Sequence, residues 1–112
     1  GPAHRLNDVL AGWQDVRITP MFGRWGYYVG DRLFACFPLR AKDTDLWLRL
    51  SREDQRRAVD SGAFTPHPRM GAQGWVVCHV DGLRAAGRTL SWLKKGYDNA
   101  RRVVEREERE EP

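Results

Sequence analysis

Seven apolar residues near the C-terminus recur at alternating intervals of three and four positions, and this pattern constrains the fold more than any other. They are Leu83, Ala86, Leu90, Leu93, Tyr97, Ala100 and Val104. Because an α-helix completes a turn in about 3.6 residues, the pattern predicts a helix of about six turns over residues 83–104. A coiled coil would show the same spacing, but Gly87 and Gly96 disfavour one. We therefore expect the helix to pack its apolar stripe on a sheet.

The residues before this helix predict that sheet. The segment 21–37, MFGRWGYYVGDRLFACF, contains Gly30 and Asp31 between two apolar runs, which is typical of a type II′ hairpin turn. Pairing the two runs outward from this turn sets Gly26 opposite Ala35, a small pair that a helix could approach closely. The three glycines of the segment fit neither dinucleotide-binding nor P-loop spacing, so we interpret the segment as scaffold.

Hydrophobic periodicity predicts the remaining elements. We expect helices at 7–16 and 51–62, strands at 25–29, 32–37, 45–50 and 74–80, and an edge strand or loop at 64–70. Ser51 is positioned to cap the second helix, and Gly62 is positioned to end it in a left-handed conformation. Pro66 and Pro68 confine the 64–70 segment to a sheet edge or a loop.

The length of 112 residues predicts one domain. We assign this domain to residues 1–104, interpret residues 1–2 as the remnant of a removed tag, and assign an acidic tail to residues 105–112. The tail holds five of the 15 acidic residues and two of the 19 Lys and Arg, so it carries a charge of −3 and the remainder +7. A positive body favours an anionic partner. The tail is expected to extend the last helix, to fray, or to fold back on this body.

No catalytic or cofactor-binding pattern occurs in the sequence. Cys36 and Cys78 lie in apolar runs and form no ligand spacing with the three histidines, so we expect buried free thiols, as suits a reducing cytoplasm. Tyr27, Tyr28 and His79 also carry reactive groups, but their spacing does not require a shared site. We expect no enzyme activity, cofactor, metal or small-molecule substrate. No apolar run approaches the roughly 20 residues that span a bilayer, so no membrane association is expected.

The basic residues of the long helix gather away from its apolar stripe. Arg84, Arg88, Lys95 and Arg102 fall within about 40° of one another on a helical wheel, and Lys94 and Arg101 lie nearer the edge of the stripe. Asp98 is the only acidic residue between positions 83 and 104. Two interpretations are open: a solvated outer face, or a nucleic-acid-binding face that contacts backbone phosphates.

Three tryptophans are candidate partner-binding residues. Trp92 lies about 120° from the centre of the apolar stripe, so it either packs beneath a loop or anchors a partner. Trp47 and Trp75 share one face of the predicted sheet with His79. If no helix covers this face, it would form a homodimer surface or stack nucleic-acid bases. If the first helix covers it, the face is a second core layer.

The hairpin segment also resembles a known family. Residues 21–23 (MFG), 26–29 (GYYV) and 32–35 (RLFA) resemble the N-terminal domain of the TfoX/Sxy family, whose outline YjbR-like proteins share. The resemblance covers about residues 16–102. It implies an α+β fold, a two-layer sandwich of helices on an antiparallel five-stranded sheet, as in secretion-chaperone-like folds. Arg24 stands where the family usually has a second glycine.

The resemblance also implies a function. Members of the family are bacterial regulators of competence genes and are thought to act with a cyclic-AMP receptor protein at promoters. We therefore expect a cytoplasmic, non-catalytic binding module, an accessory transcription regulator that contacts the DNA backbone, a protein partner, or both. The alternative is a protein–protein interaction or homodimerisation domain with no nucleic-acid role.

Overall fold

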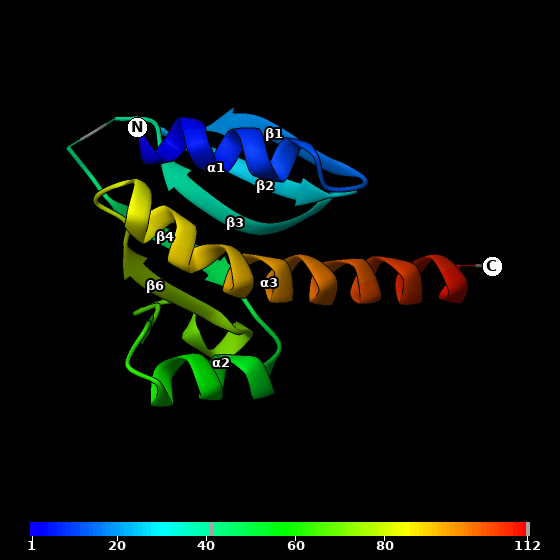
Figure 1. Cartoon of the computed structure of the whole chain (residues 1–112). Coiled ribbons are helices and arrows are strands. Elements are labelled where there is room, and N and C mark those ends of the chain that lie inside the picture. Colours follow the sequence, from blue (N-terminus) through cyan, green and yellow to red (C-terminus); the bar gives the residue numbers. More distant parts are fainter. Residues whose placement is uncertain (41, 112) are drawn as a thin grey trace.

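The computed structural model describes residues 1–40 and 42–111. It shows an antiparallel sheet with helices packed on it, which confirms the expected α+β class (Figure 1). In chain order the elements are α1 (Pro2–Ala11), β1 (Val16–Met21), β2 (Arg24–Val29), β3 (Arg32–Pro38), β4 (Asp45–Arg49), α2 (Arg52–Asp60), β5 (Thr65–Pro66), the 3-10 turn η1 (Gly71–Gln73), β6 (Trp75–His79) and α3 (Leu83–Glu110). The strand order is β1-β2-β3-β4-β6-β5, so the described sheet has six strands rather than the expected five.

The additional strand is β1, which the sequence pattern did not predict. We expected a helix over residues 7–16, but α1 ends at Ala11 and β1 begins at Val16. Pro20 lies inside β1, where its missing N–H is tolerated because β1 is the edge strand next to β2 in the described sheet. The helix begins earlier than expected because Pro2 occupies its first turn, a position that suits proline.

The hairpin of β2 and β3 has the predicted turn but a different register. Gly30 has a φ of +57°, and Val29 pairs with Arg32 as the turn requires. A bulge beyond the second pair then shifts the register, so Gly26 pairs with Cys36 rather than with Ala35. The expected close approach of a helix to Gly26 is therefore wrong. The side chains of Tyr28 and Leu33 occupy that space instead: a Cβ on Gly26 would lie 2.9 and 3.3 Å from them.

The close approach of helix and sheet occurs at Gly96 of α3. A Cβ at this position would lie 2.6 Å from Leu48 Cδ1 and 2.9 Å from the carbonyl oxygen of Arg49. Both contacts are shorter than van der Waals distance, so glycine is required for α3 to lie directly on β4. In the apolar stripe of α3, Ala86, Leu93, Tyr97 and Ala100 are buried as predicted, and Leu90 and Val104 are partly buried against the core. Leu83 at its start is exposed.

Helix α1 packs on the same face of the sheet as α3 (Figure 1). Leu6 and Leu10 are fully buried in the core with Leu93 and Tyr97. Two buried tyrosines find polar partners at this interface: Tyr27 Oη donates to Asn7 Oδ1 at 2.6 Å, and Tyr97 Oη donates to the Gln14 carbonyl at 2.6 Å. The interpretation of the opposite face as a second core layer under the first helix is therefore wrong.

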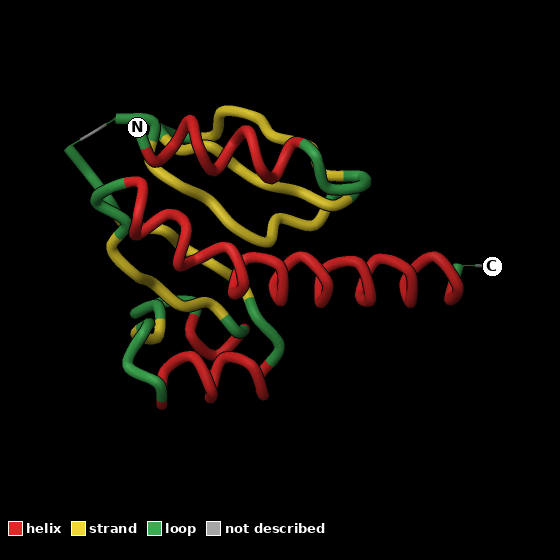
Figure 2. Tube along the Cα trace, viewed as in Figure 1, coloured by secondary structure: helices red, strands yellow, loops and turns green. Residues whose placement is uncertain are grey.

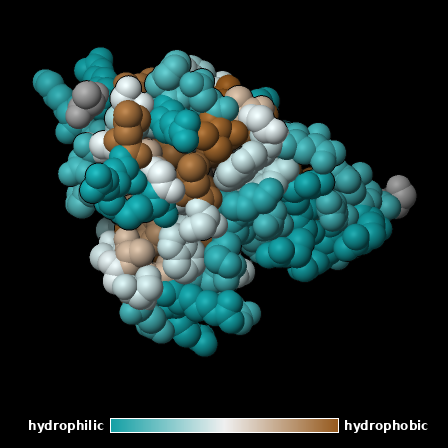
Figure 3. All heavy atoms as spheres, viewed as in Figure 1, coloured by the Kyte–Doolittle hydropathy of each residue, from teal (hydrophilic) through white to brown (hydrophobic). Residues whose placement is uncertain are grey.

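The acidic tail extends α3. The helix continues without interruption to Glu110, so residues 105–110 are helical and project beyond the sheet (Figure 2). This projecting end is hydrophilic on the visible face (Figure 3). Within the described residues, no helix combines the length and the apolarity needed to span a bilayer.

Helix α2 has the predicted ends and lies beside the β5 edge of the sheet (Figure 1). Ser51 Oγ accepts a hydrogen bond from the Asp54 N–H at 3.1 Å, which confirms the N-cap. Gly62 has a φ of +81°, the left-handed conformation expected after the helix. Ala58 contributes the apolar face of α2 to the core.

Replacement of Gly96 by alanine is expected to destabilise the domain by about 1–2 kcal/mol. The methyl group would overlap Leu48 and the backbone of β4, and this strain exceeds the gain in helix propensity. Gly87→Ala is the matched control, because Gly87 lies in the same helix and its new methyl group would meet no packed atom within 4 Å. It should stabilise by about 0.5–1 kcal/mol. Urea unfolding measures the free energy of unfolding of both variants. Equal changes in the two would contradict the close contact of Gly96 with β4.

Candidate functional site

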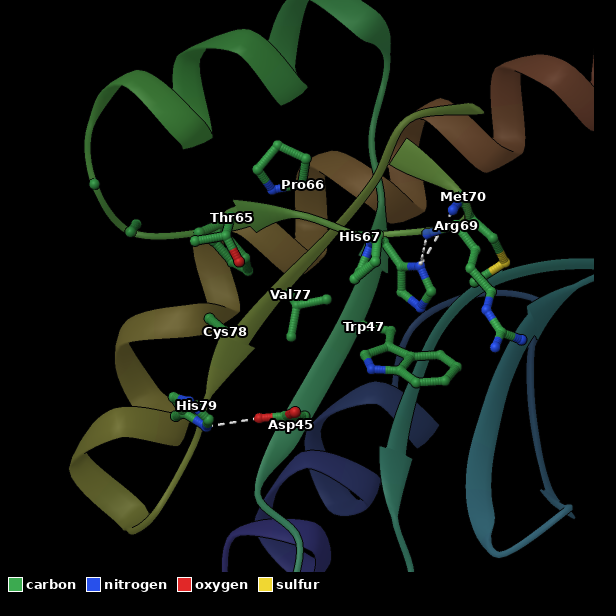
Figure 4. Close-up of a pocket in the computed structure, with 14 residues that line it drawn as sticks. Asp45, Trp47, Thr65, Pro66, His67, Arg69, Met70, Val77, Cys78 and His79 are labelled. Atoms are coloured by element: carbon green, nitrogen blue, oxygen red, sulfur yellow. Dashed lines mark hydrogen bonds and ion pairs between the residues drawn. The ribbon is translucent and has the colours of Figure 1, made fainter. Parts of the chain in front are cut away.

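The face of the sheet opposite α1 and α3 carries side chains from β4 and β6. Asp45 pairs with His79, and Trp47 pairs with Val77. Because alternate residues of a strand point to the same side, these four side chains project together from the uncovered face, with α1 and α3 behind the sheet (Figure 4). Paired residues lie about 5 Å apart across the strands, and the two pairs lie about 7 Å apart along them.

Residues 62–70 rise beside this face and enclose a hollow with it. We name it the β4–β6 hollow; its volume is about 840 Å³, and its lining lies within residues 45–79 (Figure 4). Val77 forms the floor, Thr65 and Pro66 form one side, and Asp45 and His79 lie at one end. The lining is mostly apolar, with a few polar groups at the ends.

Phe64 holds the 62–70 segment in place. Its side chain is buried in the core and packs edge-on against Trp92 of α3, with ring centroids 5.9 Å apart. Thr65 then pairs with Val77 in the short edge strand β5, as the prediction of an edge strand or loop allowed. The core contact of one aromatic residue therefore positions the segment that encloses the hollow.

Trp47, the aromatic wall of the hollow, is fixed by Arg24 from β2. The guanidinium carbon of Arg24 lies 4.1 Å from the Trp47 ring centroid, a cation–π contact. Arg24 Nε also donates to Cys36 Sγ at 3.2 Å, and its terminal nitrogen donates to the carbonyl oxygens of Cys36 and Asp45. Only 11% of the Arg24 side chain is exposed, and Asp43 lies 3.6 Å away as a counter-ion.

His67 contacts Trp47 from the enclosing segment. The two ring centroids lie 4.6 Å apart at an interplanar angle of 84°. His67 Nδ1 accepts hydrogen bonds from the backbone N–H groups of Arg69 at 3.1 Å and Met70 at 3.2 Å. Burial lowers the pKa of His67, and the nearby charges of Arg69 and Arg24 lower it further. His67 is therefore neutral near pH 7, with its proton on Nε2.

Asp45 and His79 form a carboxylate–imidazole pair at the other end of the hollow. Asp45 Oδ1 lies 2.6 Å from His79 Nδ1. This is an ion-pair distance, but the approach is not aligned for a hydrogen bond, and the buried Oδ1 atom has no hydrogen-bond partner among the described residues. The His79 side chain is 78% exposed, so its ring reaches solvent at the mouth of the hollow.

The two cysteines are free thiols in the structure. Cys36 is buried on the uncovered face beside Arg24, and burial raises its pKa despite the opposing effect of that guanidinium. Burial and the charge of Asp45 raise the pKa of Cys78 to about 12. Neither group is therefore a thiolate near neutral pH. Among the described residues, no cluster of three or more His, Cys, Asp or Glu could hold a metal ion.

The structure divides the six basic residues predicted to bind nucleic acid into two groups. Lys94 lies 4.7 Å from the Tyr97 ring centroid and 3.9 Å from Asp98, and Arg101 donates to Tyr97 Oη at 3.4 Å. These two side chains are therefore engaged within the molecule. The other four are exposed and form no ion pair with a described residue; they are Arg84, Arg88, Lys95 and Arg102, which we name the α3 cation stripe.

None of the three candidate partner-binding tryptophans is free on the surface. Trp75 is only 4% exposed, so its side chain offers little surface to a partner in this conformation. At this end of β6, the neighbouring Arg49 donates to the Gln73 carbonyl of the η1 turn at 2.9 Å. Trp92 packs on Phe64 of the 62–70 segment, which matches the alternative that it packs beneath a loop. Trp47 is half-buried in its contacts with Arg24 and His67.

Sequence reasoning missed the residues that matter most to the hollow. Arg24 stands out in the sequence only as a departure from a glycine, and no pattern distinguishes Asp45 or His67. Tyr27 and Cys78, two of the reactive groups expected to share no site with His79, both point to the covered face of the sheet: Tyr27 is in the core under α1, and Cys78 pairs with Leu46 and packs against the core. The pairing of Asp45 with His79 could have been found by aligning the two predicted strands, had the sequence indicated that they are neighbours.

The fold and the hollow define a class of protein: an α+β domain with a ligand-sized hollow on the uncovered face of an antiparallel sheet. The comparisons with known proteins add one likeness in sequence. The family model of the Luciferase domain matches residues 32–84, slightly less than half of the chain. No curated protein and no solved structure matches the chain. The comparisons therefore do not confirm the resemblance to the TfoX/Sxy family.

The matched range coincides with the site. Residues 32–84 run from β3 to the start of α3 and include every residue that lines the β4–β6 hollow. They exclude β1, β2 and nearly all of α3, and therefore Arg24 and most of the α3 cation stripe. The likeness thus concerns the part of the molecule that builds the hollow.

Replacement of Arg24 by methionine is expected to destabilise the domain by about 2–3 kcal/mol. The change keeps the length of the side chain but removes the cation and leaves the buried carbonyl oxygens of Cys36 and Asp45 without their donor. Arg17→Met is the matched control, since Arg17 lies 4.4 Å from the Tyr28 ring on the exposed part of the same face. It should cost about 0.5 kcal/mol. Urea unfolding measures the free energy of unfolding of both variants. A similarly small loss of stability in Arg24→Met and Arg17→Met would contradict a structural role for Arg24.

Proposed function

We propose that this domain binds a planar aromatic small molecule in the β4–β6 hollow. The observation that carries the proposal is the hollow itself, whose volume of about 840 Å³ lies in the range of small-molecule sites. Like such sites, it combines a mostly apolar lining with a few polar groups at defined positions. This revises the expectation, drawn from sequence motifs, that the protein has no small-molecule ligand.

The shape of the hollow favours a flat ligand. Val77 offers an apolar floor, and Trp47 offers an aromatic wall whose orientation is fixed by Arg24 and His67. An aromatic ring placed beside Trp47 would gain about 0.5–1.5 kcal/mol beyond the burial of its area. Asp45 and His79 lie at one end, where they would orient a polar substituent.

The likeness to the Luciferase domain supports the same site. The family is named after an enzyme, and an enzyme needs a site that holds its substrate. The matched residues 32–84 include the whole lining of the hollow. The match supports a shared ligand-binding role for this region, and it gives a reason to test the domain for catalysis.

A second candidate function, binding of the DNA backbone, rests on the α3 cation stripe. Its four side chains are exposed on one helix and lack ion pairs with described residues, whereas an ordinary exposed helix face mixes charges of both signs. Contacts of this kind would position the protein on DNA without reading its sequence. The stripe is the support for a role as an accessory transcription regulator, with or without a protein partner.

The first proposal predicts that planar aromatic fragments bind at the hollow. In a screen of indole- and naphthalene-sized fragments by ¹H–¹⁵N correlation spectra, shifts should concentrate at Trp47, Val77 and His79, with dissociation constants of about 1 mM or below. Val77→Lys should abolish the binding, because it places a charged chain on the floor. Thr19→Lys, on the same sheet face in β1 but outside the hollow, should leave it unchanged. Shifts scattered over the surface, or equal binding by both variants, would refute the proposal.

The second proposal predicts that Arg88, Lys95 and Arg102 are needed for DNA binding. Reversing all three to glutamate should abolish retention on DNA at low salt, and wild-type binding should weaken steeply as salt rises. The control reverses Arg5, Arg40 and Arg56, three arginines elsewhere in the chain, and so makes the same change in net charge. If wild type is not retained, or if both triple variants lose binding equally, the stripe has no specific role.

A further inference from the structure

The end of the β4–β6 hollow has the geometry of a proton-accepting site. Asp45 is the first residue of β4 and His79 the last residue of β6, and the two are direct partners in the antiparallel register. Their side chains meet on the uncovered face and close one end of the hollow (Figure 4). The pair lies about 7 Å along the strands from Val77 and Trp47, a distance that a bicyclic aromatic ligand spans.

Asp45 determines which nitrogen of His79 carries the proton. The buried Asp45 Oδ1 has no hydrogen-bond partner among the described residues, and a buried carboxylate oxygen is costly unless a donor satisfies it. The donor within reach is a proton on His79 Nδ1, 2.6 Å away; Thr44 Oγ1 lies 3.4 Å from the same nitrogen, where its hydroxyl oxygen can accept from that proton as well. Hydrogen bonds of catalytic groups often become aligned only when a ligand is bound. In a neutral imidazole that holds its proton on Nδ1, Nε2 is the acceptor.

His67, the other histidine of the hollow, has the opposite arrangement. Its Nδ1 already accepts hydrogen bonds from two backbone N–H groups, so its remaining nitrogen carries the proton and donates. His67 therefore cannot accept a proton from a ligand without losing these bonds. His79 differs, because its ring is exposed and no described residue forms a hydrogen bond with its Nε2.

We infer that His79 is a general base toward the ligand of the hollow and that Asp45 is its positioning residue. The inference rests on the proposed binding of a planar aromatic molecule, and it identifies that ligand as one with an acidic C–H or O–H group. The C–H or O–H bond breaks, the proton moves to His79 Nε2, and the electron pair stays on the ligand. Asp45 remains ionised and stabilises the imidazolium, which then returns the proton to water or to the product.

A planar aromatic probe with one acidic C–H bond tests the inference. In 5-nitrobenzisoxazole, removal of the proton at C3 breaks the N–O bond and releases a coloured cyanonitrophenolate, so the reaction needs a base and no other reactant. Wild type should accelerate this reaction with saturation kinetics. His79→Ala should lower kcat roughly 100-fold, and Asp45→Asn should lower kcat on the order of 10-fold with KM unchanged.

The matched control is a second histidine–aspartate pair outside the hollow. His4 and Asp8 lie 3.2 Å apart on the exposed face of α1, so His4→Ala should leave the rate unchanged. If the probe shifts the resonances of Trp47 and Val77 but His79→Ala reacts as fast as wild type, the general-base role is overturned and ligand binding stands. If the probe shifts neither residue, the proposed function fails, and the general base fails with it.

Discussion

The contact of α3 with β4 at Gly96 is the constraint on which the rest of the structure depends. Because this residue has no side chain, the helix lies directly on Leu48 and on the backbone of Arg49. The apolar stripe of α3 and the leucines of α1 then bury one face of the sheet. Among the described elements no helix remains to cover the opposite face, and the chain encloses part of it with residues 62–70 instead. The hollow is thus a consequence of how the core is packed.

The wall of that hollow depends on a charge held within the sheet. Arg24 is nearly buried, and such a group is stable only where its donors are satisfied and its charge is balanced. Here the carbonyl oxygens of β3 and β4 accept its N–H groups, Asp43 supplies a counter-ion, and the Trp47 ring lies against the guanidinium. Together these contacts hold Trp47 in one orientation, which preorganises an aromatic surface before any ligand binds.

The two proposed functions use different parts of the molecule. The hollow lies on the uncovered face of the sheet, whereas the α3 cation stripe lies on a helix packed against the other face. A ligand in the hollow would not obstruct an anionic partner on α3. Residues 105–110 extend α3 as a charged helix beyond the sheet and do not fold back on the stripe, which stays exposed.

The sequence by itself determined what depends on neighbours along the chain: the 83–104 stripe, the Gly30 turn, the Ser51 cap and the strands at β4 and β6. It did not determine β1, where Pro20 suggested a break, or the bulge that moved Gly26 opposite Cys36, because edge position and register depend on pairing with other strands. The site was decided only by the tertiary structure. Arg24, Asp45, His67 and His79 are far apart in sequence, and they meet because β4 lies between β3 and β6 and because both α1 and α3 pack on the opposite face.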